Sequence, residues 1–281
     1  MRKPRSRSLV AGLAVSLFTL PIAACSTETT DRGADGQAAV TLVAAADPSL
    51  LPYNFLDTDG KTWKGINVDL AAALSEKLGS TITFQSAGFD TIVPGLAAGR
   101  FDLALTGMFD TLERQKTVDF VDYLAAKNNF LTLTTFRDVA SMDDLCGVRV
   151  GIPGGALEST LLADASAECV KAGKPAIDVN EFADLDATVL ALRSGRIDVT
   201  PNDSAANAYI NSQNKDTMKV SGGYLNEGYF AAAFPKNSEL AKKVEAAFSE
   251  IIDDGTYAGI LREWGVEDRA LEAPIINGAT F

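Results

Sequence analysis

The sequence has 281 residues, of which 47% are hydrophobic, and its formal net charge at pH 7 is −12. A chain this acidic disfavours nucleic acids and anionic membrane surfaces as partners. It contains no histidine and no GxxxxGK[ST] or GxGxxG motif, which excludes Ser-His-Asp, Cys-His and HExxH chemistry and the common phosphate cradles. We therefore expect neither a cofactor nor a metal ion.

The first 24 residues have the pattern of an export signal. Cations precede a mostly apolar core over residues 9–22, which is too short to span a bilayer as a helix. Small residues then precede Cys25, a pattern that resembles the bacterial lipobox, so we expect Cys25 to carry a lipid after cleavage. Plain secretory cleavage is the alternative. The polar segment 25–37 is expected to be a flexible tether to the outer face of the cell membrane.

Export changes how the two other cysteines are interpreted. In an oxidising compartment Cys146 and Cys169 are expected to form a disulfide that closes a loop of about 23 residues. Two separate thiols are the alternative. A zinc site is not expected, because two thiolates without histidine leave the metal short of ligands.

From residue 39 onward, strand patterns alternate with helix patterns, which indicates an α/β fold with parallel sheets. An apolar run over 39–46 predicts a strand that ends at Asp47. Because ligands collect at the carboxyl ends of such strands, Asp47 is a candidate site residue, although it could simply start a turn at Pro48. A helix with Asn67 as its cap and a strand over 81–85 follow.

The stretch 99–120 is the central candidate for a binding site. It predicts a buried strand over 101–105, a turn over 106–109 and a helical turn capped by Thr111. Arg114 follows within reach of the turn. A guanidinium and N–H donors at a helix start together could bind a small carboxylate. An ordinary strand, turn and helix with a solvated arginine is the alternative.

Residues 96–107 and 192–203 repeat one pattern at an offset of 96. Each predicts a helix end, a glycine stop and a strand that enters a polar turn. We interpret this repeat as two lobes of similar build that face a shared cleft, although any two βαβ units look alike. The two polar turns are Thr106-Gly107 and Asn202-Asp203.

The rest of the chain continues the alternation and ends in an irregular tail after Trp264. The expected elements are a strand over 129–136, a helical turn and strand over 143–152, a glycine-rich turn over 153–156, a helix over 158–169, a strand over 177–180, a helix over 187–193, a strand over 229–234, and helices over 239–253 and 257–264.

Five separated motifs carry a family resemblance. They are GINVDLAAALSEKLG (65–79), FDTIVPGLAAGRFDLALTGMFDTLERQKTVDF (89–120), LCGVRVGIPGG (145–155), RSGRIDVTPND (193–203) and DDGTYAGILREWG (253–265). In this order the chain resembles the extracellular solute-binding proteins of amino-acid ABC importers. The resemblance implies a two-lobed type II periplasmic-binding fold in which each lobe is a mostly parallel sheet flanked by helices.

The resemblance also implies where the lobes lie and how they work. Lobe 1 would comprise residues 38–123 plus 229–281, lobe 2 would comprise 128–225, and two crossover strands would lie near 124–127 and 226–228. A monomer of this kind captures a solute between its lobes by hinge closure and delivers it to an ABC permease in the membrane.

Residue by residue, the resemblance implies that Arg114 binds the ligand α-carboxylate with help from N–H groups of the preceding turn at Gly107. Asp203 would take the α-ammonium, aided by Thr106. The ligand side chain would face Asp47 and Phe89.

Three departures from the family pattern make the expected pocket more apolar and poorer in donors. They are Phe109 and Ala156, each in place of a hydroxyl residue, and Leu50 in place of a stacking aromatic ring. Tyr53 or Trp63 could supply the missing aromatic ring. Asn202 and Glu158 are further candidate site residues.

We therefore expect a binding receptor and not an enzyme. Acidic candidates, including Glu158 and Glu227, outnumber the one clear arginine and favour a ligand with a neutral or cationic side chain, unless Lys127 or Arg149 lies near the site. Two alternatives stay open. One is a lyase resembling the periplasmic cyclohexadienyl dehydratases, with Glu158 or Asp47 as general acid. The other is a sensing module for a signalling partner.

Overall fold

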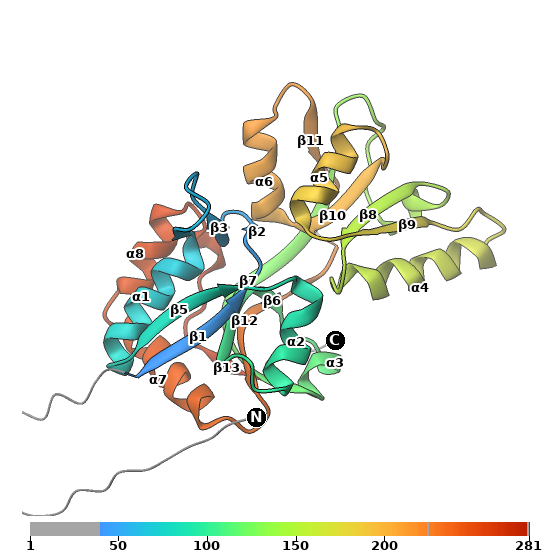
Figure 1. The fold of residues 1–281 in the computed structure, drawn as a ribbon. Coiled ribbons are helices and arrows are strands. Elements are labelled where there is room, and N and C mark those ends of the chain that lie inside the picture. Colours follow the sequence, from blue (N-terminus) through green and yellow to red (C-terminus); the bar gives the residue numbers. More distant parts are fainter. Residues whose placement is uncertain (1–39, 224, 280) are drawn as a thin grey trace, which may run out of the picture. The chain divides into compact units, whose positions relative to one another are not determined.

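The computed structural model of the chain describes residues 40–223, 225–279 and 281 (Figure 1). These residues belong to one unit, Ala39–Phe281. The predicted export signal, the tether and Cys25 therefore lie outside the described residues. Within the described part of the chain, no helix is both long enough and apolar enough to cross a membrane.

The main sheet follows the strand order β5-β1-β6-β12-β7-β10-β8-β9. Its outer strands pair in parallel, whereas β12 and β7 pair antiparallel with each other and with their neighbours β6 and β10. Two further strands, β11 and β13, pair with β7. The bounds are β1 Thr41–Ala46, β5 Thr81–Ser86, β6 Leu103–Phe109, β7 Val118–Leu133, β8 Arg149–Pro153, β9 Asp178–Phe182, β10 Val199–Asp203, β11 Met218–Ser221, β12 Glu227–Pro235 and β13 Ile275–Ile276.

Helices cover both faces of this sheet (Figure 1). Near β1, β5 and β6, helices α1, α7 and α8 pack together on one face and α2 packs against the sheet separately. The alternation of side chains along each strand explains the two layers, since neighbours such as Ala44 and Ala45 belong to different hydrophobic clusters. The helix bounds are α1 Ile66–Leu78, α2 Phe89–Ala97, α3 Leu112–Gln115, α4 Glu158–Lys171, α5 Leu185–Arg193, α6 Ser204–Gln213, α7 Glu239–Asp253 and α8 Thr256–Glu263.

Around β8 and β10 the same alternation produces two further clusters. Phe130 of β7 belongs to the cluster on the α4 side, and the next residue, Leu131, belongs to the cluster with Ile197. The predicted disulfide is confirmed, because Cys146 and Cys169 are joined with Cα atoms 5.6 Å apart. It ties α4 to the short 3₁₀ turn η1, Met142–Leu145.

Strand β7 runs without interruption through residues 124–127, where the first crossover was predicted. In that region it pairs with β12, with Leu124 opposite Phe230 and Lys127 opposite Glu227. Two segments about 100 residues apart in the sequence therefore lie side by side as hydrogen-bonded strands.

Local sequence rules predicted both ends of one helix correctly and other features wrongly. Helix α7 has the predicted ends, with Ser238 accepting a hydrogen bond as its N-cap. Strand β6 extends to Phe109, so the predicted turn over 106–109 is wrong, because pairing with β12 continues the strand. Asn67 is not a helix cap either. Gly65 holds that position, and Asn67 is buried against Asn54 and Tyr123.

The remaining elements are short. A small antiparallel sheet consists of β2 Ser49–Leu50, β3 Asn54–Leu56 and β4 Trp63–Lys64. The tail, predicted to be irregular, contains a 3₁₀ turn η2, Glu267–Arg269, and strand β13, which pairs with residues 121–122 of β7.

Candidate functional site

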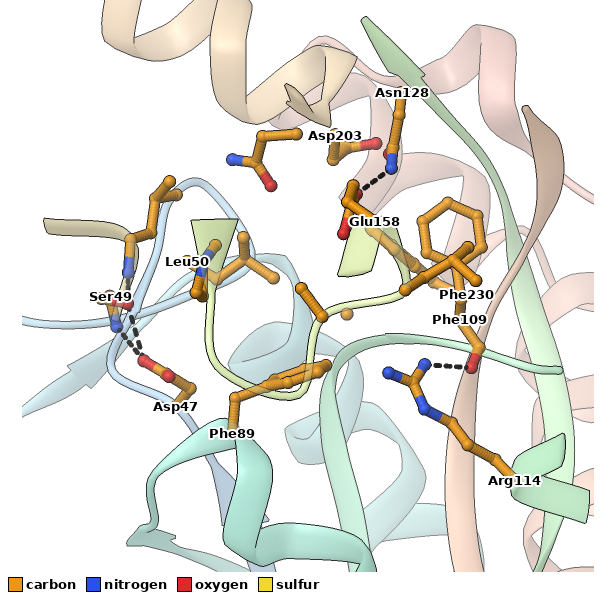
Figure 2. Close-up of a pocket in the computed structure, with 16 residues that line it drawn as sticks. Asp47, Ser49, Leu50, Phe89, Phe109, Arg114, Asn128, Glu158, Asp203 and Phe230 are labelled. Carbon is orange, nitrogen blue, oxygen red and sulfur yellow. Dashed lines mark hydrogen bonds between the residues drawn. The ribbon is translucent and has the colours of Figure 1, made fainter. Parts of the chain in front are cut away.

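A cavity lies where β1, β6 and β10 end, close to the start of α2 and the loop between β8 and α4 (Figure 2). Its volume is about 60 Å³. Most residues predicted for the ligand site line it, from both copies of the repeated sequence pattern. These are Asp47, Leu50, Phe89, Gly107, Phe109, Arg114, Ala156, Glu158, Asn202 and Asp203.

Arg114 provides the positive charge of the cavity. The hydroxyl of Thr111 caps α3 by accepting from the Arg114 N–H at 3.2 Å, as the sequence predicted. The guanidinium donates to the carbonyls of Phe109 at 2.8 Å and Gly155 at 3.0 Å, and it lies 5.4 Å from the centre of the Phe89 ring. Burial lowers the pKa of Arg114 to about 10, so the side chain stays charged at neutral pH.

Glu158 is the first residue of α4 and is only 6% exposed. The amide of Asn128 donates a hydrogen bond to Glu158 Oε1, as Figure 2 shows. Burial raises the pKa of Glu158 to about 7, although its own N–H and the nearby charge of Arg114 favour the ionised form. The cavity thus contains a carboxyl group that titrates near neutrality.

Asp203 ends β10 and caps α6. Its Oδ1 accepts from the N–H groups of Ala205 at 2.9 Å and Ala206 at 3.1 Å, and from the Tyr53 hydroxyl at 2.9 Å. Its Oδ2 accepts from Arg269 at 2.7 Å, in an ion pair whose side chains are 2% and 6% exposed. Asp203 therefore lies at the cavity as predicted, but it already binds a cation from the tail of the chain.

Asp47 has both roles that the sequence suggested, since it starts a turn and lies at the cavity. Its Oδ1 accepts from the N–H of Ser49 at 2.8 Å and from the Ser49 hydroxyl at 2.7 Å, which starts the turn after β1. It also lines the cavity, as Figure 2 shows. Burial raises its pKa and the nearby Asp184 adds to this, whereas the bonds from Ser49 lower it.

The apolar wall contains aromatic rings in an edge-to-face arrangement. Phe109 and Phe230 have ring centres 4.9 Å apart, and Phe230 also lies 5.0 Å from Tyr53. Gly107 has φ +61°, and a Cβ atom there would lie 2.6 Å from Leu50 Cδ2, so glycine allows Leu50 to approach the strand.

Three predicted site residues do not line the cavity. Thr106 is buried beside it and accepts from the Asp47 N–H at 2.9 Å. Tyr53 is fully buried behind Asp203, and Trp63 packs against Phe84 with ring centres 5.4 Å apart. Phe230, which the sequence reasoning did not select, lines the cavity with Phe89 and Phe109 instead.

Within the described ranges, no group of three or more Cys, Asp or Glu residues is placed to bind a metal ion. The charged residues that line the cavity are Asp47, Glu158, Asp203 and Arg114. Chemically, this arrangement suits a small solute that carries a carboxylate for Arg114 and at least one group that donates hydrogen bonds to carboxylates.

The bacterial extracellular solute-binding proteins, family 3, match residues 42–267. The chain belongs to this family. Among its relatives it is 30% identical over 237 residues to the arginine-binding protein ArgT of Corynebacterium glutamicum, across 84% of this chain and 78% of that protein. It is 28% identical over 254 residues to the arginine-binding extracellular protein ArtP of Bacillus subtilis, across 90% and 95%.

Two solved structures support the same assignment. An ancestral arginine-binding protein bound to glutamine has a TM-score of 0.74 and 30% identity, covering 81% of this chain and 98% of that one. An ancestral arginine-binding protein bound to arginine has a TM-score of 0.73 and 32% identity, covering 80% and 97%. The predicted α/β, two-lobed periplasmic-binding fold and the role of solute-binding receptor are thereby confirmed.

The sequence analysis did not identify Arg269, Asn128 and Phe230 as residues of the site. Arg269 lies beyond the matched range and beyond the last motif, so no pattern connected it with Asp203, 66 residues away. Phe230 lies within an apolar strand pattern, where no local signal separates residues that face the cavity from residues of the core. Asn128 is a polar residue in a buried strand, and this polarity is the local signal that could have indicated it.

Proposed function

We propose that this family 3 protein binds an amino acid or amino-acid-like solute through the solute's carboxylate. The observation that carries the proposal is Arg114, which lines the cavity while two carbonyl groups hold its guanidinium. Because a guanidinium has five N–H donors, three remain for a carboxylate, enough for a two-pronged contact.

The charge of the cavity supports a neutral or cationic ligand side chain. Three carboxyl residues and one arginine line it, and neither Lys127 nor Arg149 is among the lining residues. The names of several relatives agree with this preference, since they are called arginine-, histidine- and L-cystine-binding proteins. A dicarboxylic amino acid would require a second free cation.

We propose further that the solute is captured between lobe 1, residues 38–123 plus 229–281, and lobe 2, residues 128–225. The antiparallel pairing of β7 with β12 through residues 124–127 and 227–230 supports crossovers at 124–127 and 226–228. Strands in this position can bend without losing the hydrogen bonds between them, which permits hinge closure.

The family name and the start of the sequence support an extracytoplasmic receptor. We propose that Cys25 carries a lipid that anchors a monomer to the outer face of the membrane, with residues 25–37 as a tether. The receptor would deliver its solute to an ABC permease, as the names of relatives such as the ABC transporter arginine-binding protein 1 of Escherichia coli suggest.

One observation favours a second candidate, an enzyme of the lyase type. Glu158 is a buried carboxyl group in the cavity with a pKa of about 7, which suits a general acid. The curated relatives are named as binding proteins, so we favour binding without turnover. Product formation from prephenate or arogenate with purified protein would reverse this preference.

The proposal is tested by thermal shift, in which the purified full chain is screened against the standard L-amino acids and against opines, betaines and ectoine as amino-acid-like solutes. A solute at 100 times its Kd should add about 2.7 kcal/mol of stability, a rise of several degrees in Tm. Arg114→Met should weaken binding of the best solute by about 10- to 100-fold in calorimetry, because a charged hydrogen-bond partner is lost.

Arg149→Met is a matched control, because Arg149 lies outside the cavity in an exposed ion pair with Asp198. It should bind as the wild type does. The proposed function is contradicted if none of these solutes stabilises the protein, or if Arg114→Met and Arg149→Met bind the best solute equally well.

A further inference from the structure

The carboxylate of Asp203 has little acceptor capacity left for a ligand. A carboxylate offers about four lone-pair positions. Three donors share Oδ1, namely the Tyr53 hydroxyl and the N–H groups of Ala205 and Ala206. The guanidinium of Arg269 takes one of the two positions on Oδ2, which leaves one position there. A ligand ammonium at the remaining position would lie beside the Arg269 guanidinium, whose like charge would repel it.

Arg269 would have to leave Asp203 before an ammonium could bind there without this repulsion, and Arg269 is held firmly. Its side chain is buried, and besides Asp203 it donates to the Tyr53 hydroxyl at 3.0 Å and to the Ser204 hydroxyl. Burial alone would lower its pKa, but the Asp203 carboxylate outweighs this and raises it, so Arg269 stays charged. Its removal from Asp203 would leave a buried charge without a partner, which is strongly unfavourable.

Glu158 has more unused acceptor capacity than Asp203, and no cation of the chain is bound to it in the described structure. Among the described residues two donors reach its carboxylate, the amide of Asn128 and the backbone N–H of Glu158 itself. The carbonyl oxygen of Asn128 is buried and has no hydrogen-bond partner in the described structure. A carboxylate with about two unused lone-pair positions therefore lies beside an unpartnered amide oxygen.

Arg114 and Glu158 line the same cavity, and their charges interact. The carboxylate and the ammonium of an α-amino acid are attached to one carbon atom, so their two partners must face a common small space. This pair meets that condition with one positive and one negative side chain. Asp203, already neutralised by Arg269, would contribute little attraction to an ammonium.

We propose that Glu158, and not Asp203, receives the α-ammonium of the bound amino acid, and that Arg269 holds Asp203 as an internal ion pair. This inference rests on the proposed function and assigns the second half of the amino-acid head group. The inference predicts that Arg269, in the tail of the chain, stabilises the site and does not leave Asp203 when a ligand binds.

The test compares each variant with the wild type in calorimetry at pH 8.5, with the purified full chain. The probes are the standard L-amino acid that binds the wild type most tightly and the same acid without its α-amino group. Glu158→Gln should weaken the amino acid by about 10- to 100-fold and the des-amino acid by less than about threefold. Glu168→Gln, on the exposed side of the same helix, is the matched control.

Arg269→Met tests the role of the tail. It should lower the Tm of the ligand-free protein and leave affinity within about threefold of the wild type, and Arg269→Lys provides the comparison that keeps the charge. A roughly tenfold or greater gain in affinity for Arg269→Met would overturn the inference, because it would show that Arg269 competes with the ligand at Asp203.

Unchanged affinity in Glu158→Gln would also overturn the inference while leaving the proposed function intact. A wild type that binds no amino acid would overturn the inference, and one that binds none of the screened solutes would overturn the proposed function as well.

Discussion

Two ionisable side chains with opposite charge give the cavity its chemical character. Burial disfavours the charged form of each side chain, which lowers the pKa of Arg114 to about 10 and raises that of Glu158 to about 7. Arg114 therefore stays protonated across the physiological range, whereas Glu158 changes its charge within it. Binding of a ligand carboxylate by Arg114 should therefore be nearly independent of pH in this range. Binding of a ligand ammonium by Glu158 should depend on pH.

The affinity for an L-amino acid should therefore fall in acid. If ionised Glu158 binds the ammonium, a pKa of about 7 makes binding about 30-fold weaker at pH 5.5 than at pH 8.5. Calorimetry at these two values measures the change. Glu158→Gln should show a flat profile, and a wild-type affinity that does not change with pH would contradict the assignment.

Strands β6 and β7 and the tail meet at a second pair of carboxyl groups. Asp110 follows β6 and Asp122 lies on β7, and the tail N–H groups of Gly278 and Ala279 donate to Asp122 and Asp110 at 3.0 Å each. Asp122 Oδ1 has no partner in the described structure unless it carries a proton and donates to Asp110. Burial, with the charge of Asp110, raises the pKa of Asp122 to about 8.

This raised pKa predicts a loss of stability as the pH rises. The folded protein keeps a proton on Asp122 that the unfolded chain loses above about pH 4, so each pH unit between about 4 and 8 costs up to about 1.4 kcal/mol. The free energy of unfolding in urea should fall between pH 5 and pH 8. Asp122→Asn should reduce this slope.

Asp216→Asn, at an exposed position, is the control for this measurement and should keep the wild-type slope. Equal slopes in all three proteins would show that Asp122 is ionised in the folded state.

At the scale of the whole molecule, the last residues act as a structural element and not as a loose end. Strand β13 pairs with β7, Asn277 Oδ1 accepts from the Phe120 N–H at 2.8 Å, and the Phe281 carbonyl accepts from the Leu112 N–H at 2.8 Å. The tail thus joins the main sheet to α3, the helix that contains Arg114.

Deleting residues 271–281 while keeping Arg269 should lower the free energy of unfolding by about 2–4 kcal/mol, since several hydrogen bonds worth about 1 kcal/mol each are lost. Guanidinium denaturation measures the change. Asn277→Ala should account for part of it. An unchanged midpoint after the deletion would show that the tail does not contribute to stability.

Features that depend on residues close together in the sequence were predicted correctly, whereas features that depend on distant segments were not. Helix α7 was predicted with its correct ends because its cap and apolar face are local features. The predicted end of β6 was wrong because pairing with a distant strand, β12, extends β6. The prediction that Asn67 caps α1 was wrong because Asn67 instead bonds to Asn54 and Tyr123, which belong to other elements. The family motifs allowed the prediction that Arg114 and Asp203 share one site. The contact between Arg269 and Asp203 is visible only in the structure.

Glu158 and Asp122, two buried carboxyl groups with pKa values raised to about 7 and about 8, also make this protein well suited to spectroscopy. Because the sequence contains no imidazole, a side-chain titration near neutral pH is free of the usual histidine background. Infrared difference spectra across this range should therefore show the carbonyl stretch of each protonated acid directly. Isotope labelling of glutamate or aspartate would separate the band of the cavity from the band under the tail.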